Sequence, residues 1–174
     1  MSCRTIVPIE LTPEAFIGEL ESSNFTKWLT NLKNHGMLDD DSNERSVQFY
    51  VASYFANKIF NEGLYYPKKI LLEKNYLEDK KRIPDIQLVS RYEEKTQFWM
   101  EIKVYLNPKK KPSNQDNEEL NKDLRSISWA KGENMKVRFL IIESESVDVK
   151  DMVRNLASEK YPSLDENDII FLTL

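Results

Sequence analysis

Apolar and polar side chains alternate along this chain with two different periods, and those periods predict its helices and strands. Apolar residues recur three or four positions apart in five segments, which we predict as helices over residues 11–21, 24–34, 43–61, 117–131 and 149–160. They alternate or run together in segments predicted as strands over residues 68–77, 86–92, 97–106, 136–143 and 168–174. This order predicts an α/β fold with a mixed central sheet flanked by helices.

The segment 97–106 alternates most sharply. One face is apolar throughout, and the other consists of Trp99, Glu101, Lys103 and Tyr105. If residues 93–95 form the turn to the preceding strand, Tyr92 pairs with Thr96 and Asp85 with Lys103. Asp85, Glu101 and Lys103 would then converge on one face. A turn of two or four residues would separate them unless a β-bulge restored the register.

The segment 43–61 carries an apolar stripe with helical spacing, formed by Val47, Tyr50, Val51, Tyr54, Phe55 and Ile59. Glu44 lies three residues before Val47, at the N-terminal end of that stripe. One interpretation is a capping box, with Asp41 as the N-cap and Glu44 at the third helical position. The other is a carboxylate that reaches from the helix start towards a site on the sheet.

Composition narrows the possible functions. The chain has 174 residues, 40% of them hydrophobic and 31% charged, which is typical of one globular domain. A single cysteine and a single histidine exclude a disulfide framework and the usual zinc sites. We see no signal peptide and no membrane span, so we expect a cytoplasmic protein. Although the net charge is −4, residues 67–111 carry 12 basic and 7 acidic side chains. That local field could attract a polyanion, or the lysines could protect the edge of a sheet.

Two carboxylates and a lysine in the middle of a sheet suit a hard cation and a phosphate group. Asp85 and Glu101 offer oxygen ligands for Mg²⁺ or Mn²⁺, and the backbone carbonyl of Ile102 could add another. Lys103 could position an attacking water or offset negative charge in the transition state. The alternative is a surface salt bridge between Glu101 and Lys103, with Asp85 as a solvated residue after Pro84.

The pattern Pro84-Asp85, fifteen residues, then Glu101-Ile102-Lys103 resembles the motif of the PD-(D/E)XK nuclease superfamily. The resemblance covers residues 43–143 and implies a restriction-endonuclease-like αβββαβ core. It implies that Asp85 and Glu101 are metal ligands, that Lys103 is the catalytic lysine and that Glu44 joins the site. It also implies a polar residue from the helix that follows, for which the candidates are Asp123, Lys122 and Gln115.

The domain organisation and function follow from that resemblance. We expect a single domain over residues 1–174, made of a helical extension (1–42), the nuclease-like core (43–143) and a C-terminal helix and strand (144–174). The expected activity is that of a metal-dependent nuclease, specifically a DNA endonuclease. The lysines of the loop, Lys109, Lys110 and Lys111, could contact phosphates or simply be solvated. Because cutting a duplex commonly needs two sites, a homodimer is a further hypothesis.

Two other functions remain open from the sequence. The chain could be a catalytically inactive member of the same fold that binds nucleic acid or assists an assembly. It could also be a protein-interaction domain, a hypothesis that draws on the acidic overall charge.

Overall fold

The structure is a computed structural model, and it describes residues 12–39, 42, 44–62, 68–72, 84–90, 96–107, 113–146 and 149–174. Its elements are, in chain order, α1 (Pro13–Leu20), α2 (Ser23–Asn34), α3 (Glu44–Glu62), β1 (Lys68–Leu72), β2 (Ile86–Ser90), β3 (Thr96–Tyr105), α4 (Asn114–Gly132), β4 (Lys136–Glu143), α5 (Lys150–Lys160), a short 3₁₀ turn (Glu166–Asp168) and β5 (Ile169–Thr173). Each predicted helix and strand is present. The predicted strands 68–77 and 86–92 are described only as far as Leu72 and Ser90.

The strands form one mixed sheet in the order β1-β2-β3-β4-β5 across the described residues. The pairs β1–β2 and β2–β3 are antiparallel, and the pairs β3–β4 and β4–β5 are parallel. Helices α4 and α5 form the two crossovers that parallel neighbours require. The α/β fold with a mixed sheet flanked by helices is therefore confirmed.

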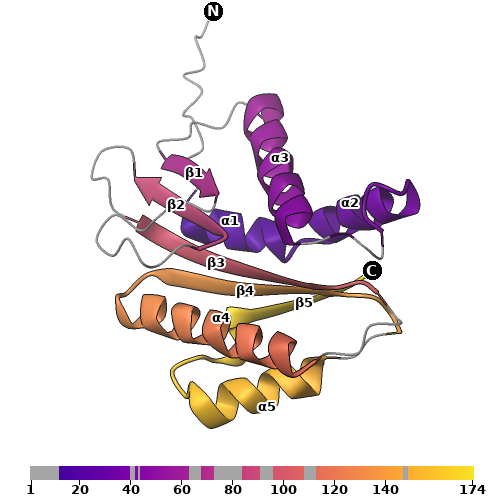
Figure 1. The fold of residues 1–174 in the computed structure, drawn as a ribbon. Coiled ribbons are helices and arrows are strands. Elements are labelled where there is room, and N and C mark those ends of the chain that lie inside the picture. Colours follow the sequence, from indigo (N-terminus) through magenta and orange to yellow (C-terminus); the bar gives the residue numbers. More distant parts are fainter. Residues whose placement is uncertain are drawn as a thin grey trace, which may run out of the picture.

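Helices cover both faces of the sheet (Figure 1). The three N-terminal helices, α1 to α3, lie on one side, and α4 and α5 lie on the other. The N-terminal helices do not stand apart from the sheet, because Phe16 of α1 and Phe25 of α2 are fully buried in the same core as Met100 of β3.

The alternation of β3 explains why there are two cores. Its residues Phe98, Met100 and Ile102 are buried against the N-terminal helices. Trp99 and Tyr105 belong to the second core, which α4 and α5 cover. Since successive side chains of a strand point to opposite faces, Glu101 and Lys103 lie on the α4 side with Trp99. Both are buried there, at 5% and 6% exposure.

The register between β2 and β3 differs from the prediction. Thr96 pairs with Val89, so the predicted pair of Tyr92 with Thr96 is wrong, and so is the pair of Asp85 with Lys103. The turn predicted over 93–95 lies outside the described residues. Because Ile86 pairs with Met100, the next position places Asp85 level with Glu101. That is a displacement of two residues, which keeps the side chain on the same face.

A β-bulge preserves this arrangement. Leu88 pairs with Phe98 whereas Val89 pairs with Thr96, so Gln97 is an extra residue on β3. Without that extra residue, the pairing set at Val89 would bring Asp85 level with Met100, on the opposite face from Glu101. The bulge thus keeps Asp85 on the same face as Glu101, which is the effect that the sequence analysis expected of a β-bulge.

No helix in the described part of the chain is long and apolar enough to cross a membrane. Three further predictions fall on residues or side chains outside that part: the N-cap role of Asp41, the lysines Lys109 to Lys111 and the side chain of Gln115.

Candidate functional site

The carboxylate of Asp85 lies where β2 begins beside the longer β3. Its Oδ2 accepts a hydrogen bond from the backbone N–H of Ile102 at 2.6 Å. Since β2 starts at Ile86, no backbone carbonyl of β2 reaches that N–H, and the side chain of Asp85 takes its place. Its Oδ1 accepts from the amide of Gln48 on α3 at 2.7 Å. Asp85 is therefore held by one strand and one helix.

Glu101 is held on the α4 side of the sheet. The indole Nε1 of Trp99 donates to its Oε1 at 2.9 Å. Trp99 is itself fully buried and packs edge-on against Trp129 of α4. The position of the Glu101 carboxylate is thus fixed by a rigid aromatic neighbour.

Lys103 is surrounded by carboxylates from two helices. Its Nζ lies 2.9 Å from Glu44 of α3, 3.2 Å from Glu119 of α4 and 3.3 Å from Asp123 of α4. Lys103 therefore connects α3 with α4 beside the start of β2. The expectation that Asp85, Glu101, Lys103 and Glu44 come together is confirmed as geometry; their predicted roles are a separate matter. For Glu44, the ion pair is the interaction that the structure records, and the alternative capping box needs Asp41, which lies outside the described residues.

Helix α4 contributes two acidic residues. Of the three candidates on this helix, Asp123 reaches Lys103, while Lys122 is exposed and acts on Asp123 only through its charge. Glu119 of α4 and Gln48 of α3 are two site residues that the sequence did not predict. A signal was present in both cases, because Gln48 lies four residues after Glu44 and Glu119 four residues before Asp123, so each pair shares a helix face.

The ionisation of these groups reflects their burial and mutual repulsion. Burial, reinforced by the charges of Glu44 and Asp123, raises the pKa of Asp85 to about 7, although the hydrogen bond from Ile102 opposes the rise. Burial and the neighbouring Asp85 raise the pKa of Glu101 well above its ordinary value. Burial likewise raises the pKa of Asp123 to about 6, with Lys103 opposing. The pKa of Lys103 is lowered by burial but raised overall by Asp123 and Glu44.

The donor set fits a hard divalent cation. Among the described residues, the site gathers three carboxylates at Lys103 and the neighbouring carboxyl groups of Asp85 and Glu101, and all of these acceptors are oxygen. Mg²⁺ and Mn²⁺ bind such oxygens. Because the N–H and C=O of one strand residue point to the same edge, we expect the carbonyl of Ile102 to face Asp85 as its N–H does.

The described residues contain no group of three or more acidic, histidine or cysteine side chains that is ready to hold a metal. The reason lies in the contacts of the acidic side chains. Glu44, Glu119 and Asp123 are all turned towards Lys103, which leaves Asp85 and Glu101 as the available pair. Asp85, Glu101 and the carbonyl of Ile102 are the metal ligands that the sequence predicted. The protein thus provides two carboxylates for a metal ion, one fewer than a group of three.

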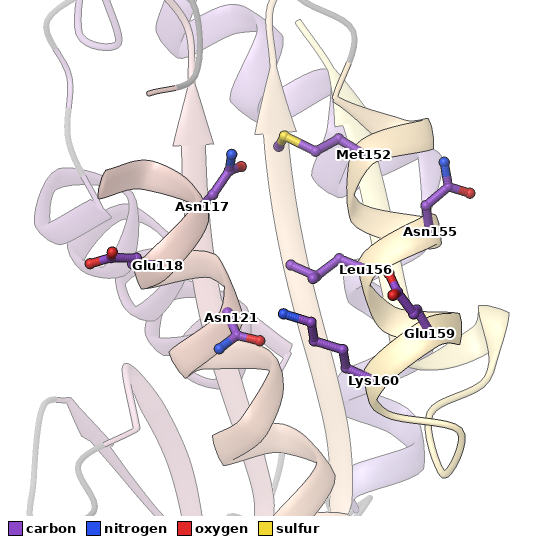
Figure 2. Close-up of a pocket in the computed structure, with 8 residues that line it drawn as sticks. All are labelled: Asn117, Glu118, Asn121, Met152, Asn155, Leu156, Glu159 and Lys160. Carbon is purple, nitrogen blue, oxygen red and sulfur yellow. The ribbon is translucent and has the colours of Figure 1, made fainter. Parts of the chain in front are cut away.

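A groove lies between α4 and α5, away from the residues that surround Lys103. It has a volume of about 460 Å³ and is lined by Asn117, Glu118, Asn121, Met152, Asn155, Leu156, Glu159 and Lys160. Leu156 and Lys160 point into the space between the helices (Figure 2). None of the residues around Lys103 lines this groove, so it is separate from the candidate site.

Comparison of the chain with protein-family models, with curated protein sequences and with solved structures found no match.

Proposed function

We propose that this protein is a metal-dependent nuclease that hydrolyses phosphodiester bonds in DNA and has a restriction-endonuclease-like core. The observation that carries the proposal is the convergence of Asp85, Glu101 and Lys103 at the start of β2, with both carboxylates hydrogen-bonded in place. The element order from α3 to β4 also fits the αβββαβ core that the motif implies.

Each side chain has a role that its contacts support. Asp85 and Glu101, with the carbonyl of Ile102, would hold Mg²⁺ or Mn²⁺. A bound divalent ion lowers the pKa of a water ligand and stabilises charge on a phosphoryl oxygen. Gln48 and Trp99 orient the two carboxylates through hydrogen bonds of 2.7 and 2.9 Å. Such supporting contacts matter because metal ligands must be fixed before the ion arrives.

Lys103 would position the attacking water or stabilise the developing negative charge. Its pKa is raised overall, since the charges of Asp123 and Glu44 outweigh its burial, so it stays protonated at neutral pH. A protonated lysine is a poor general base but a good hydrogen-bond donor. The geometry therefore favours an electrostatic role for this side chain.

The test is incubation of the full chain with single-stranded and double-stranded DNA and RNA, with and without Mn²⁺. We expect Mn²⁺-dependent cleavage of at least one substrate, and we expect Glu101→Gln to lower kcat/KM at least about 100-fold because it weakens a metal ligand. A matched control is Glu143→Gln, since Glu143 is also buried but accepts from the backbone N–H of Val149, just before α5. Binding of nucleic acid without cleavage would support an inactive binding module, and neither binding nor cleavage would favour a protein-interaction domain.

A further inference from the structure

The hydroxyl group of Tyr105 is buried and has no hydrogen-bond partner among the described residues. Tyr105 lies two residues after Lys103 on the same face of β3 and is 9% exposed. In the described part of the chain, its hydroxyl oxygen is one of two buried side-chain atoms that make no hydrogen bond. Buried tyrosine hydroxyls usually find a partner, because an unpaired hydroxyl has lost its hydrogen bonds to water and gained none in the fold. A phenylalanine would serve the core better, so packing alone does not account for this hydroxyl.

The surroundings of this hydroxyl are those of the candidate site. Electrostatic interactions connect it with Lys103, Asp116, Asp123 and Glu44. Burial is the main reason that the pKa of Tyr105 rises to about 12, so the group keeps its proton at neutral pH and can donate. The nearby carboxylates have other donors: Asp116 accepts from Ser113, and Asp123 faces Lys103.

The other donors of the site are already engaged. The amide of Gln48 donates to Asp85, and the indole of Trp99 donates to Glu101. Lys103 is shared among three carboxylates. A phosphate group that enters this acidic site needs donors for its oxygens, and among the described residues Tyr105 is a donor on this face that has no acceptor.

We propose that the Tyr105 hydroxyl is a phosphate-binding donor of this site, which donates to an oxygen of the bound phosphate group. The inference rests on the proposed function, because it assigns that group to a phosphodiester. Rotation of neighbouring side chains is needed to admit the ligand, and Glu119 and Glu44 are 50% and 38% exposed. The ion pairs of Lys103 and the unpaired hydroxyl of Tyr105 among the described residues are then two features of the same unliganded site.

The test compares Tyr105→Phe with Tyr161→Phe. Tyr161 is a matched control, because its hydroxyl donates within the fold to the backbone oxygen and side chain of Asn121, at 3.0 and 2.9 Å. With Mg²⁺ present in every sample, we expect inorganic phosphate to raise the unfolding midpoint of the wild type and of Tyr161→Phe but not of Tyr105→Phe. Without phosphate, Tyr105→Phe should unfold no earlier than the wild type, whereas Tyr161→Phe should lose about 2–4 °C. In the cleavage assay, Tyr105→Phe should lower kcat/KM about 10- to 100-fold.

Each outcome has a definite meaning. A phosphate-induced shift that is equal in Tyr105→Phe and the wild type would overturn the assignment, and so would the absence of a shift in the wild type. A lower midpoint for Tyr105→Phe without phosphate would also overturn it, because the hydroxyl would then have a structural partner. Cleavage by the wild type tests the proposed function separately. If phosphate binds through Tyr105 but no nucleic acid is cut, the nuclease proposal is wrong and the assignment of Tyr105 as a phosphate-binding donor is kept.

Discussion

At the scale of single residues, the site concentrates negative charge that the fold does not neutralise. Asp85 and Glu101 are desolvated, and each lies close enough to other carboxylates that repulsion adds to the cost of ionisation. Lys103 balances only part of this charge, because three carboxylates share it. Residues arranged in this way lower the stability of the unliganded protein, and the proposed function expects a bound cation to relieve their repulsion.

The pH dependence of stability tests this description of Asp85. Its pKa is raised to about 7, so between about pH 4 and pH 7 the folded protein holds a proton that the unfolded chain has lost. Stability therefore falls as the pH rises through this range. We expect Asp85→Asn, which can still accept from Ile102, to be more stable than the wild type at pH 8 by about 1–3 kcal/mol without divalent ions. Urea unfolding at a series of pH values measures the difference.

The matched control should show the opposite sign. The hydrogen bond from Lys131 is the main reason that the pKa of Asp165 is lowered, so its carboxylate stabilises the fold above its unfolded pKa. Asp165→Asn should therefore be less stable than the wild type at pH 8. If Asp85→Asn behaved like Asp165→Asn, the Asp85 carboxylate would not be under repulsion.

The sequence was enough to predict the central residues but not all their partners. Asp85, Glu101 and Lys103 stood out because charged side chains interrupt apolar strands, and burial of charge is costly. Gln48 and Glu119 did not stand out, because polar residues are ordinary on a helix surface. Which of them faces the site depends on how α3 and α4 pack on the sheet, and that is decided by long-range contacts.

At the scale of elements, the alternation of β3 was readable because one face is entirely apolar. The pairing of β2 with β3 could not be predicted from the sequence, because the register depends on the connection and on the bulge at Gln97. The two-residue error left Asp85 on the predicted face, since side-chain direction repeats every two residues. The apolar pattern therefore predicted which face of the sheet a side chain occupies more reliably than which residues pair.

The start of α4 offers a prediction at this scale. Ser113 is its N-cap and forms a capping box with Asp116, with hydrogen bonds in both directions. We expect Ser113→Ala to cost about 1 kcal/mol and to lower the unfolding midpoint by about 2–4 °C. A control is Ser158→Ala in α5, where the hydroxyl bonds to the carbonyl of Asn155 in its own helix and caps nothing. Equal midpoints for the two variants would show that the cap contributes no stability.

At the scale of the whole molecule, the site depends on the junction of both layers. The N-terminal helices bring Glu44 and Gln48 to the start of β2 from one side, and α4 brings Glu119 and Asp123 from the other. The order of elements predicted this mixed sheet, and the apolar faces of the strands account for the two helical layers (Figure 1). The nuclease proposal needs this meeting of distant segments, since neither layer alone assembles the cluster around Lys103.

The most direct test of the proposal compares Lys103→Met with Lys131→Met in Mn²⁺-dependent cleavage. Both lysines are bound by carboxylates, Lys131 by Asp165 and Asp168, but Lys131 lies at the far end of α4 from the candidate site. We predict that Lys103→Met lowers kcat/KM by at least about 1,000-fold while Lys131→Met keeps the wild-type value within about threefold. Folding of both variants is checked by circular dichroism. Cleavage by a folded Lys103→Met at the wild-type rate would contradict the proposal that this cluster is the active site.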